Sequence, residues 1–261
     1  MRAEIGIIGG TGVYDPRFLK NCEEIKLKTP YGSPSDSVTV GELNGRKVAF
    51  VPRHGRKHTI RPTDVNSRAN IWALKEIGVH WILAPSTVGS LREEFKPGET
   101  VFADQFIDRT TRREESFYTG KQVCHVSVAE PICPELRKVL IKVADEMKIS
   151  FHKTGTYVCI EGPRFSTKAE SRMFRKWGAD IVGMTLVPEC VLAREAEMCF
   201  ASISTVTDYD VWKEHPVTAN HVRKIMGENV EKVKKLITEA VSRIPEERKC
   251  KCNVALKSAL I

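Results

Sequence analysis

Short apolar runs alternate with amphipathic segments along almost the whole chain. The apolar runs are typical of buried strands, and the amphipathic segments repeat apolar residues at helical spacing. This pattern predicts strands at 3–8, 38–40, 47–51, 81–84, 156–160, 180–183 and 200–206. It predicts helices at 64–77, 134–147, 168–177 and 219–244, and one more that begins at Pro188. Strands that alternate with helices predict an α/β fold with a mostly parallel or mixed sheet.

Residues with special backbone preferences mark several of the predicted boundaries. Asn44-Gly45 favours a type I′ turn, which would join the second and third strands as a hairpin. Gly78 is placed to end the first helix, and Thr167 with Glu170 has the spacing of a capping box. Because the chain contains no repeat, linker or low-complexity tract, we expect one domain over 1–245 and a peripheral tail over 246–261.

Composition is ordinary for a soluble globular protein. The 261 residues are 41% hydrophobic and 28% charged. The apolar run near the N-terminus is too short for a signal peptide and leads into a glycine turn. No apolar run approaches the roughly 18 residues of a membrane-spanning helix. We therefore expect a cytoplasmic protein with no membrane partner.

The net charge of +8 raises the question of nucleic-acid binding. The basic residues do not form a stripe, however, and Arg112-Arg113 is followed at once by two glutamates. A solvated surface with some attraction for anions explains this distribution better, so we expect no nucleic-acid partner. The high share of charged residues also fits a thermophilic source.

Eight cysteines are many for a chain without a secretion signal. They do not form the paired CxxC knuckles of a structural zinc site, so the sequence predicts no metal. Intracellular disulfides do occur in hyperthermophiles.

Several predicted strand ends carry groups that bind anions. They are the amides of the glycine turn at 9–12, a basic pair, and a set of hydroxyls. The side chains concerned are those of Thr11, Arg53, His54, Ser86, Thr87 and Thr185. Singly, each has a structural alternative: a tight turn, a basic surface loop, or a hydroxyl that caps the next helix. Together they supply what inorganic phosphate needs, and no Gly-x-Ser-x-Gly elbow adds a fixed nucleophile.

Two carboxylates, Asp208 and Asp210, follow the apolar run at 200–206. Open α/β sheets bind ligands at the carboxyl ends of their strands. A carboxyl group held among apolar residues can stay protonated and donate a hydrogen bond, while an ionised neighbour accepts one. Adenine offers the matching acceptor at N7 and the matching donor in its 6-amino group. The alternative is a turn that uses two aspartates. Phe165 follows another predicted strand and could stack on a planar ring or belong to the core.

Six motifs resemble those of the 5′-methylthioadenosine phosphorylases, in the trimer-based purine nucleoside phosphorylase family. They are Ile7-Ile8-Gly9-Gly10-Thr11-Gly12, Arg53-His54-Gly55-Arg56, Arg68-Ala69-Asn70-Ile71, Glu161-Gly162-Pro163-Arg164-Phe165, Met184-Thr185-Leu186-Val187-Pro188-Glu189 and Thr207-Asp208-Tyr209-Asp210. The match covers nearly the whole chain. It implies a single domain with a central mixed, partly barrel-like β-sheet flanked by helices, and a homotrimer or homohexamer.

The resemblance implies phosphorolysis of methylthioadenosine to adenine and 5-methylthioribose 1-phosphate, a step of methionine and purine salvage. Inorganic phosphate is then a co-substrate, and no cofactor is expected. The alternative is a broader purine nucleoside phosphorylase that acts on adenosine, inosine or guanosine. Family members that cleave inosine or guanosine carry Asn where Asp208 stands, so this aspartate favours adenine substrates.

The resemblance also implies roles for individual residues. Phosphate would be bound by Thr11, Arg53, His54, Ser86, Thr87 and Thr185. The nucleoside-binding residues would be Phe165, Ser166, Met184, Thr207, His58, His125, Ala219 and Val222. Asp208 and Asp210 would be catalytic, the first as proton donor to N7 and the second as acceptor from the 6-amino group. His125 would reach the pocket of a neighbouring subunit.

Thermophilic archaeal members of the family resemble this chain in four cysteines. The resemblance implies a Cys133–Cys199 disulfide and a strained Cys250–Cys252 bridge in the tail. The latter closes too short a loop to contribute much through chain entropy.

Overall fold

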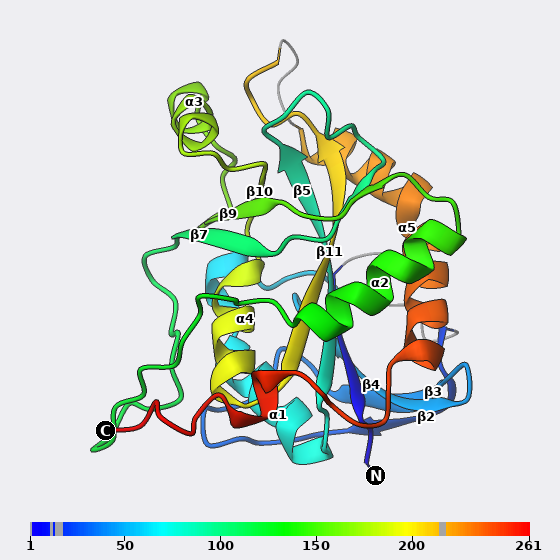
Figure 1. Ribbon diagram of the computed structural model, residues 1–261, viewed down its shortest axis with the longest axis vertical. Coiled ribbons are helices and arrows are strands. Elements are labelled where there is room, and N and C mark those ends of the chain that lie inside the picture. The colour runs from blue at the N-terminus through cyan, green and yellow to red at the C-terminus, as the bar shows by residue number, and fades with distance from the viewer. Residues whose placement is uncertain (1, 11–12, 14–17, 214–217) are drawn as a thin grey trace.

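The computed structural model describes residues 2–10, 13, 18–213 and 218–261. Within these residues, a sheet of 11 strands is flanked by α-helices (Figure 1). The strands are β1 (Ile5–Gly9), β2 (Lys20–Ile25), β3 (Val38–Leu43), β4 (Arg46–Pro52), β5 (Trp81–Ser90), β6 (Thr100–Val101), β7 (Gln105–Arg109), β8 (Phe151–His152), β9 (Thr156–Ile160), β10 (Ile181–Gly183) and β11 (Cys199–Asp208). The helices are α1 (Ser67–Ile77), α2 (Pro134–Glu146), α3 (Lys168–Lys176), α4 (Leu186–Glu195) and α5 (Ala219–Arg243).

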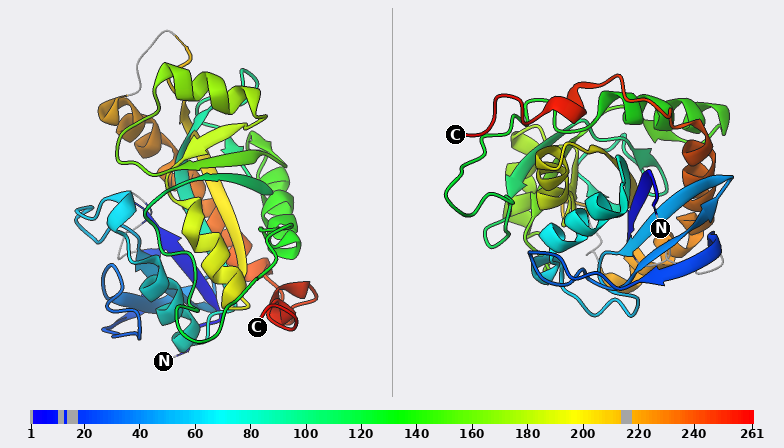
Figure 2. Two further views of the ribbon diagram at one scale, coloured as in Figure 1. Left: turned by 90° about the vertical axis from the view of Figure 1, so that its left-hand side faces the viewer. Right: turned by 90° about the horizontal axis from the view of Figure 1, so that it is seen from below.

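The sheet is mixed and branches at β5. Its main path runs β2-β3-β4-β1-β5-β10-β9-β7, while β11 joins β5 and continues through β6 to β8. β1 pairs in parallel with both β4 and β5, and β11 runs parallel to β5, whereas β3 and β4 are antiparallel. The sheet is strongly curved rather than flat (Figure 2). The predicted α/β fold with a mixed sheet is confirmed.

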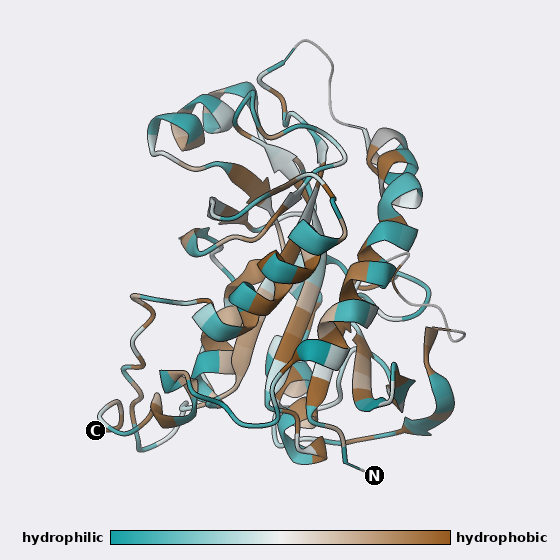
Figure 3. Cartoon of the chain, turned by 45° about the vertical axis from the view of Figure 1, so that its right-hand side comes forward, coloured by the Kyte–Doolittle hydropathy of each residue, from teal (hydrophilic) through white to brown (hydrophobic). Residues whose placement is uncertain are grey.

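Helices cover both sides of the long strands. α1 and α4 pack against each other on one side, and α2 and α5 pack together over β11 on the other (Figures 1 and 2). The strands are mostly apolar, whereas the outer faces of α2 and α5 are polar (Figure 3). α3 stands apart, and Phe174 anchors it in a small apolar cluster with Leu91 and Val158. Burial of apolar faces from both sides accounts for the large core.

Local signals in the sequence place several boundaries correctly. Asn44 and Gly45 adopt positive φ angles of 48° and 80° and join β3 to β4, which confirms the hairpin. Gly78 ends α1 in the left-handed conformation, with φ 97°. Thr167 and Glu170 form the predicted capping box of α3. α1 begins three residues later than predicted, because the side chain of Asn66 caps it by accepting from the Ala69 N–H.

β5 is longer than the sequence predicts. The expected strand ended at residue 84, but β5 continues to Ser90 because β11 pairs with it over almost its full length. Pro85 lies in a stretch that is paired along one edge only, where a missing N–H is tolerated. Ser86 and Thr87 therefore lie within a strand rather than after one.

The sequence pattern missed four strands, all short or at an edge. β2 and β7 are the two ends of the main path of the sheet, and β6 and β8 have two residues each. β2 is largely exposed and almost free of apolar residues. Such strands bury too little surface to show an apolar run.

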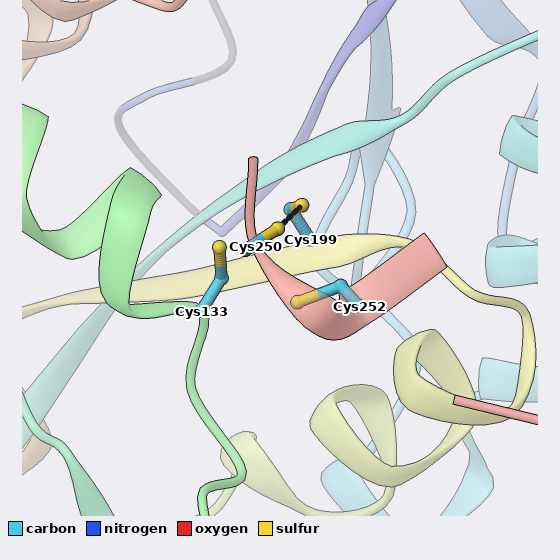
Figure 4. A group of neighbouring side chains, drawn as sticks. All are labelled: Cys133, Cys199, Cys250 and Cys252. Atoms are coloured by element: carbon cyan, nitrogen blue, oxygen red, sulfur yellow. Dashed lines mark hydrogen bonds between the residues drawn. The ribbon is translucent and has the colours of Figure 1, made fainter. Parts of the chain in front are cut away.

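The predicted disulfides are not formed in the structure. All eight cysteines belong to the described residues, and each is present there as a thiol. Cys133, Cys199, Cys250 and Cys252 gather at one point, where the sulfurs of Cys199 and Cys250 lie 3.3 Å apart (Figure 4). The tail is nevertheless docked: Arg248 donates to the carbonyl oxygen of Glu197 at 2.6 Å, and Cys252 is buried. None of the helices in the described residues combines the length and apolar character that a bilayer span needs.

Candidate functional site

Along one edge of β5, the pairing with β1 ends several residues before the pairing with β10 begins. One edge of β5 pairs with β1 as far as Leu83 and with β10 from Gly89 onward, while β11 pairs along the other edge. The stretch of β5 between these positions lines a cavity of about 590 Å³, a size typical of small-molecule sites. The end of β11, the chain after β4 and the first half of α5 complete the wall.

Arg53 follows β4, and its guanidinium is buried at one end of the cavity. Nε and Nη2 donate to the two carboxylate oxygens of Glu189, at 2.5 and 2.9 Å. Nη1 and Nη2 also donate to the carbonyl oxygens of Pro85 and Ile8. These bonds occupy four of the five N–H donors of an arginine. The remaining N–H belongs to Nη1, which lies 3.9 Å from where a Cβ of Gly10 would stand.

His54 is held as a neutral imidazole. Its Nδ1 lies 2.9 Å from the carbonyl oxygen of Ile60, so Nδ1 carries the proton and donates it. Burial, together with the positive charge of Arg53, lowers the pKa of His54 to about 4. Its ring lies 4.6 Å from that of His58, centroid to centroid. Nε2 of His54 is therefore an acceptor at neutral pH.

Hydroxyl groups line the same end of the cavity. Ser86 Oγ is buried and has no hydrogen-bond partner among the described residues. Thr185 stands at the N-cap of α4, yet within the described structure its hydroxyl makes no capping bond. Met184 lies beside Gly162, where a Cβ would come within 2.6 Å of the Met184 sulfur. Thr87 also lines the cavity.

Asp208 is the last residue of β11 and is 9% exposed. Its Oδ1 accepts from the backbone N–H of Asp210 at 2.8 Å, and its Oδ2 lies 2.8 Å from the Thr207 hydroxyl. That hydroxyl also contacts the carbonyl oxygen of Val88 at 3.3 Å. One hydroxyl proton serves one acceptor at a time. When Thr207 donates to Val88, its contact with Asp208 requires a proton on the carboxyl group.

Asp210 is buried and adopts a left-handed φ of 49°. Its backbone forms a turn, as the structural alternative predicts, and its side chain lines the cavity. Oδ2 of Asp210 and Oγ of Ser166 are both buried without a partner among the described residues. Burial is the main cause that raises the pKa of Asp210, and the nearby hydroxyls of Ser171 and Ser166, which lie outside hydrogen-bond geometry, offset part of the effect. Unpartnered buried polar atoms at a cavity wall indicate a polar ligand.

Most of the residues expected from the sequence gather around this cavity. They are Arg53, His54, His58, Ser86, Thr87, Phe165, Ser166, Met184, Thr185, Thr207, Asp208, Asp210, Ala219 and Val222. Thr11 lies outside the described residues. His125 does not line the cavity. It lies on an exposed segment, and its backbone N–H donates to the carbonyl oxygen of Ala259 at 2.7 Å.

Sequence reasoning missed part of the wall that α5 supplies. Arg223, Val230 and Val233 line the cavity together with Ala219 and Val222. These positions recur every three, four or seven residues, so they share one face of the helix. Extending that periodicity from Ala219 and Val222 would have found them.

Comparisons with known proteins place almost the whole chain in one family. The family model of the phosphorylase superfamily matches residues 4–242. The S-methyl-5′-thioadenosine phosphorylase of Thermofilum pendens is 60% identical over 260 residues, which cover 100% of this chain and 99% of that protein.

Two solved structures are closely similar. A methylthioadenosine phosphorylase from an antarctic soil metagenomic library matches with a TM-score of 0.94 and 45% identity, over 100% of this chain and 93% of that one. The methylthioadenosine phosphorylase from Schistosoma mansoni in complex with adenine matches with a TM-score of 0.93 and 39% identity, over 98% and 97% of the two chains. The chain therefore belongs to the phosphorylase superfamily, and within it to the family of the S-methyl-5′-thioadenosine phosphorylases.

Proposed function

We propose that the protein catalyses the reversible phosphorolysis of 5′-methylthioadenosine to adenine and 5-methylthioribose 1-phosphate. This is a pentosyl transfer in which inorganic phosphate is the second substrate. Relatives named for this activity match the chain over its whole length.

The observation that carries the proposal is the distance, measured along β5, between the anion-binding groups and the aspartate pair. Ser86 lies near the buried arginine and histidine, whereas Gly89 is the partner of Asp208 on β11. Three residues of a strand span about 10 Å. This separation leaves room for a sugar between an anion at one end of the cavity and a planar base at the other.

The chemistry of the two ends matches the charge that develops in the reaction. Breaking the N-glycosidic bond builds positive charge on the ribose and negative charge on the purine. Phosphate below the sugar stabilises the first and then attacks the anomeric carbon, while a hydrogen bond to N7 stabilises the second. Asp208 is the donor to N7, and Asp210 accepts from the 6-amino group.

The anion end can hold a phosphate that still carries a proton. His54 is neutral, so its Nε2 accepts a hydrogen bond from a phosphate hydroxyl. The N–H of Arg53 Nη1, the Ser86 hydroxyl and the Thr87 and Thr185 hydroxyls donate to the other oxygens. Thr11 is assigned to the same anion. The Glu189 carboxylate fixes the plane of the guanidinium.

The nucleoside end carries the remaining assignments. Phe165 stacks on the base, Ser166 donates to it, and Met184 lies under the ribose. His58, Ala219 and Val222 border the 5′ substituent, where the apolar face of α5 suits a methylthio group.

We also infer an assembly of identical subunits, a homotrimer or homohexamer, in which His125 reaches the pocket of a neighbour. The observation that supports it is that His125 is exposed and lies away from the cavity of its own chain. A cytoplasmic location and the lack of nucleic-acid or membrane partners stay predictions.

Adenine release from methylthioadenosine, measured with and without phosphate, tests the reaction. We expect release that depends on phosphate and yields one sugar 1-phosphate for each adenine. Equal release in phosphate-free buffer, with free methylthioribose as product, would mean that the protein is a hydrolase.

Turnover of adenosine, inosine and guanosine tests substrate choice. We expect methylthioadenosine to have the highest kcat/KM, because its 5′ group is apolar and its base carries a 6-amino group. Higher kcat/KM for inosine or guanosine would favour the broader purine nucleoside phosphorylase.

A further inference from the structure

One buried arginine behind the cavity joins several parts of its wall. Arg113 belongs to a run of mixed charges that the sequence suggests is solvated surface, yet its side chain is only 5% exposed. It forms an ion pair with Glu161, and neither residue lines the cavity. We propose that this pair positions Met184 and Thr185 for the reaction, an inference that rests on the proposed function.

Each N–H of the Arg113 guanidinium has an acceptor. An arginine has five such donors in one plane. Nε donates to a carboxylate oxygen of Glu161 at 3.2 Å. Nη1 donates to the carbonyl oxygens of Met184, at 2.7 Å, and Val187. Nη2 donates to the carbonyl oxygens of Glu161 and Ile160, at 2.7 and 3.3 Å. One side chain therefore holds the end of β9 and the chain that leads from β10 into α4.

The carboxylate of Glu161 extends this set of bonds to two more segments. Its Oε2 accepts from the backbone N–H and the hydroxyl of Thr111, at 2.6 and 3.1 Å, and its Oε1 accepts from the Thr63 hydroxyl. Partial burial opposes ionisation, but the hydrogen bonds from Thr63, Thr111 and Arg113 outweigh it and lower the pKa of Glu161 to about 2. The pair therefore stays charged at neutral pH. Thr63 adjoins Pro62, a residue of the cavity wall.

The segments that the pair joins carry residues of both ends of the proposed site. Met184 and Thr185 line the cavity after β10, and Phe165 and Ser166 line it after β9. The two segments are also in close contact, since a Cβ on Gly162 would lie 2.6 Å from the Met184 sulfur. A shift of either segment would break bonds to the same guanidinium.

Stabilisation of the fold alone does not explain this arrangement well. A buried ion pair contributes little net stability, because desolvation offsets most of its attraction. Four of the five bonds of Arg113 instead go to backbone carbonyl oxygens of the two segments that carry site residues. Fixing a backbone matters most where displacements near 1 Å can lower a rate about 100-fold. Arg113 and Glu161 are therefore positioning residues and do not touch the substrates.

Steady-state kinetics of Arg113→Met tests the inference. Methionine keeps an unbranched side chain but donates no hydrogen bond. We expect KM for phosphate to rise and kcat to fall, each at least about tenfold, at a temperature well below the Tm of the variant. The matched control is Arg112→Met, which changes an exposed arginine one position earlier. Both of its constants should stay within about twofold of the wild type.

A double-mutant cycle separates positioning from a purely structural role. Thr185→Val removes the hydroxyl assigned to phosphate and should raise KM for phosphate by itself. If Arg113 acts through that hydroxyl, Arg113→Met should raise KM by less than about threefold in the Thr185→Val background. A purely structural role would give the same factor in both backgrounds, because independent effects multiply.

Glu161→Gln supplies a second variant and decides the matter if Arg113→Met fails to fold. Glutamine has nearly the size of glutamate, but its NH₂ group cannot accept the bonds that a carboxylate oxygen accepts. We expect KM for phosphate to rise at least about threefold. Wild-type constants in the folded variants would overturn the inference, and so would equal factors in the two backgrounds of the cycle.

The wild-type protein, assayed first, keeps the two proposals apart. Adenine release that depends on phosphate, together with unchanged variants, would overturn the role of Arg113 and Glu161 alone. Equal adenine release by the wild type without phosphate would overturn the proposed function, and this inference with it.

Discussion

Two aspartates two positions apart, Asp208 and Asp210, have different surroundings in the structure. Both oxygens of Asp208 contact groups of its own turn, the Thr207 hydroxyl and the Asp210 N–H. Asp210 instead leaves one buried oxygen without a partner among the described residues. At the scale of single residues, the proposed choice of substrate therefore depends on which atoms of the pair donate hydrogen bonds and which accept them.

Asp208→Asn is the most informative single substitution. Asparagine keeps an oxygen for the Asp210 N–H and an NH₂ group beside Thr207, so the local structure should survive. It cannot transfer a proton to N7, and we expect kcat/KM for methylthioadenosine to fall at least about 100-fold. Turnover of inosine and guanosine should rise, because the amide suits a 6-oxopurine. Steady-state kinetics on both substrate types, with Tm as the control for folding, checks this, and full activity on methylthioadenosine would contradict the donor role.

The buried histidine makes stability depend on pH. The pKa of His54 is about 4 in the folded protein and near 6.5 when unperturbed. Between these values the unfolded chain binds a proton that the folded protein does not, so the free energy of unfolding falls as pH drops from about 6.5 to 4. The expected loss from His54 is about 3 kcal/mol.

Denaturant unfolding at pH 7 and pH 4 measures this loss. His54→Gln should lose about 3 kcal/mol less than the wild type over that interval, because glutamine does not titrate. If the wild type and His54→Gln lost the same amount, the buried neutral histidine would not be the cause.

At the scale of elements, the pairing of β5 with β11 aligns the two ends of the site. The register places Gly89 opposite Asp208, after an irregularity between Val206 and Asp208. A Cβ at position 89 would lie 2.9 Å from Asp208 Oδ1 and 3.3 Å from the Cβ of Asp210. Glycine is needed at position 89 because a side chain there would collide with the two aspartates. The pairing of β5 with β11 can position both carboxyl groups only while this space stays empty.

Gly89→Ala should therefore impair catalysis more than folding. A methyl group at this position pushes both carboxyl groups out of place, and displacements near 1 Å cost up to about 100-fold in rate. We expect kcat/KM for methylthioadenosine to fall at least about tenfold. Gly120→Ala, where a Cβ would meet nothing within 4 Å, is the control and should match the wild type in kinetics and Tm. Wild-type kinetics in Gly89→Ala would show that the close contact does not restrict the pair.

At the scale of the whole molecule, the surface segment that carries His125 is tied to the end of the chain. His125 and Val123 both pair with backbone groups of the last residues. His125 is exposed and does not line the cavity of its own chain, so a role in catalysis requires a second subunit.

Co-expression of two impaired chains tests that role. Asp208→Asn removes the donor from its own pocket, and His125→Ala removes the residue offered to a neighbour. In mixed oligomers some pockets combine an intact Asp208 with an intact His125 from the next subunit. We expect such mixtures to have more activity than either variant alone, and light scattering to give the mass of three or six chains. A mixture no more active than the average of its parents would place His125 outside the neighbouring pocket.

The sequence by itself determined the alternation of strands and helices, the hairpin, the caps of α1 and α3, and the residue types of the site. Each of these depends on neighbours within a few positions, such as the positive φ of Asn44-Gly45 or the reciprocal bonds of Thr167 and Glu170. The family motifs add residue roles because they are short and continuous.

Only the tertiary structure decided features that join distant segments. The extension of β5 requires β11, and the bidentate partner of Arg53 comes from α4, 136 positions along the chain. The helix face that closes the cavity and the meeting of four cysteines likewise come from separate parts of the chain. Spacing along the sequence could not predict this cluster, because the four sulfurs become neighbours only when α2, β11 and the tail pack together. Local preferences act over a few bonds, whereas these contacts exist only after the core has brought remote segments together.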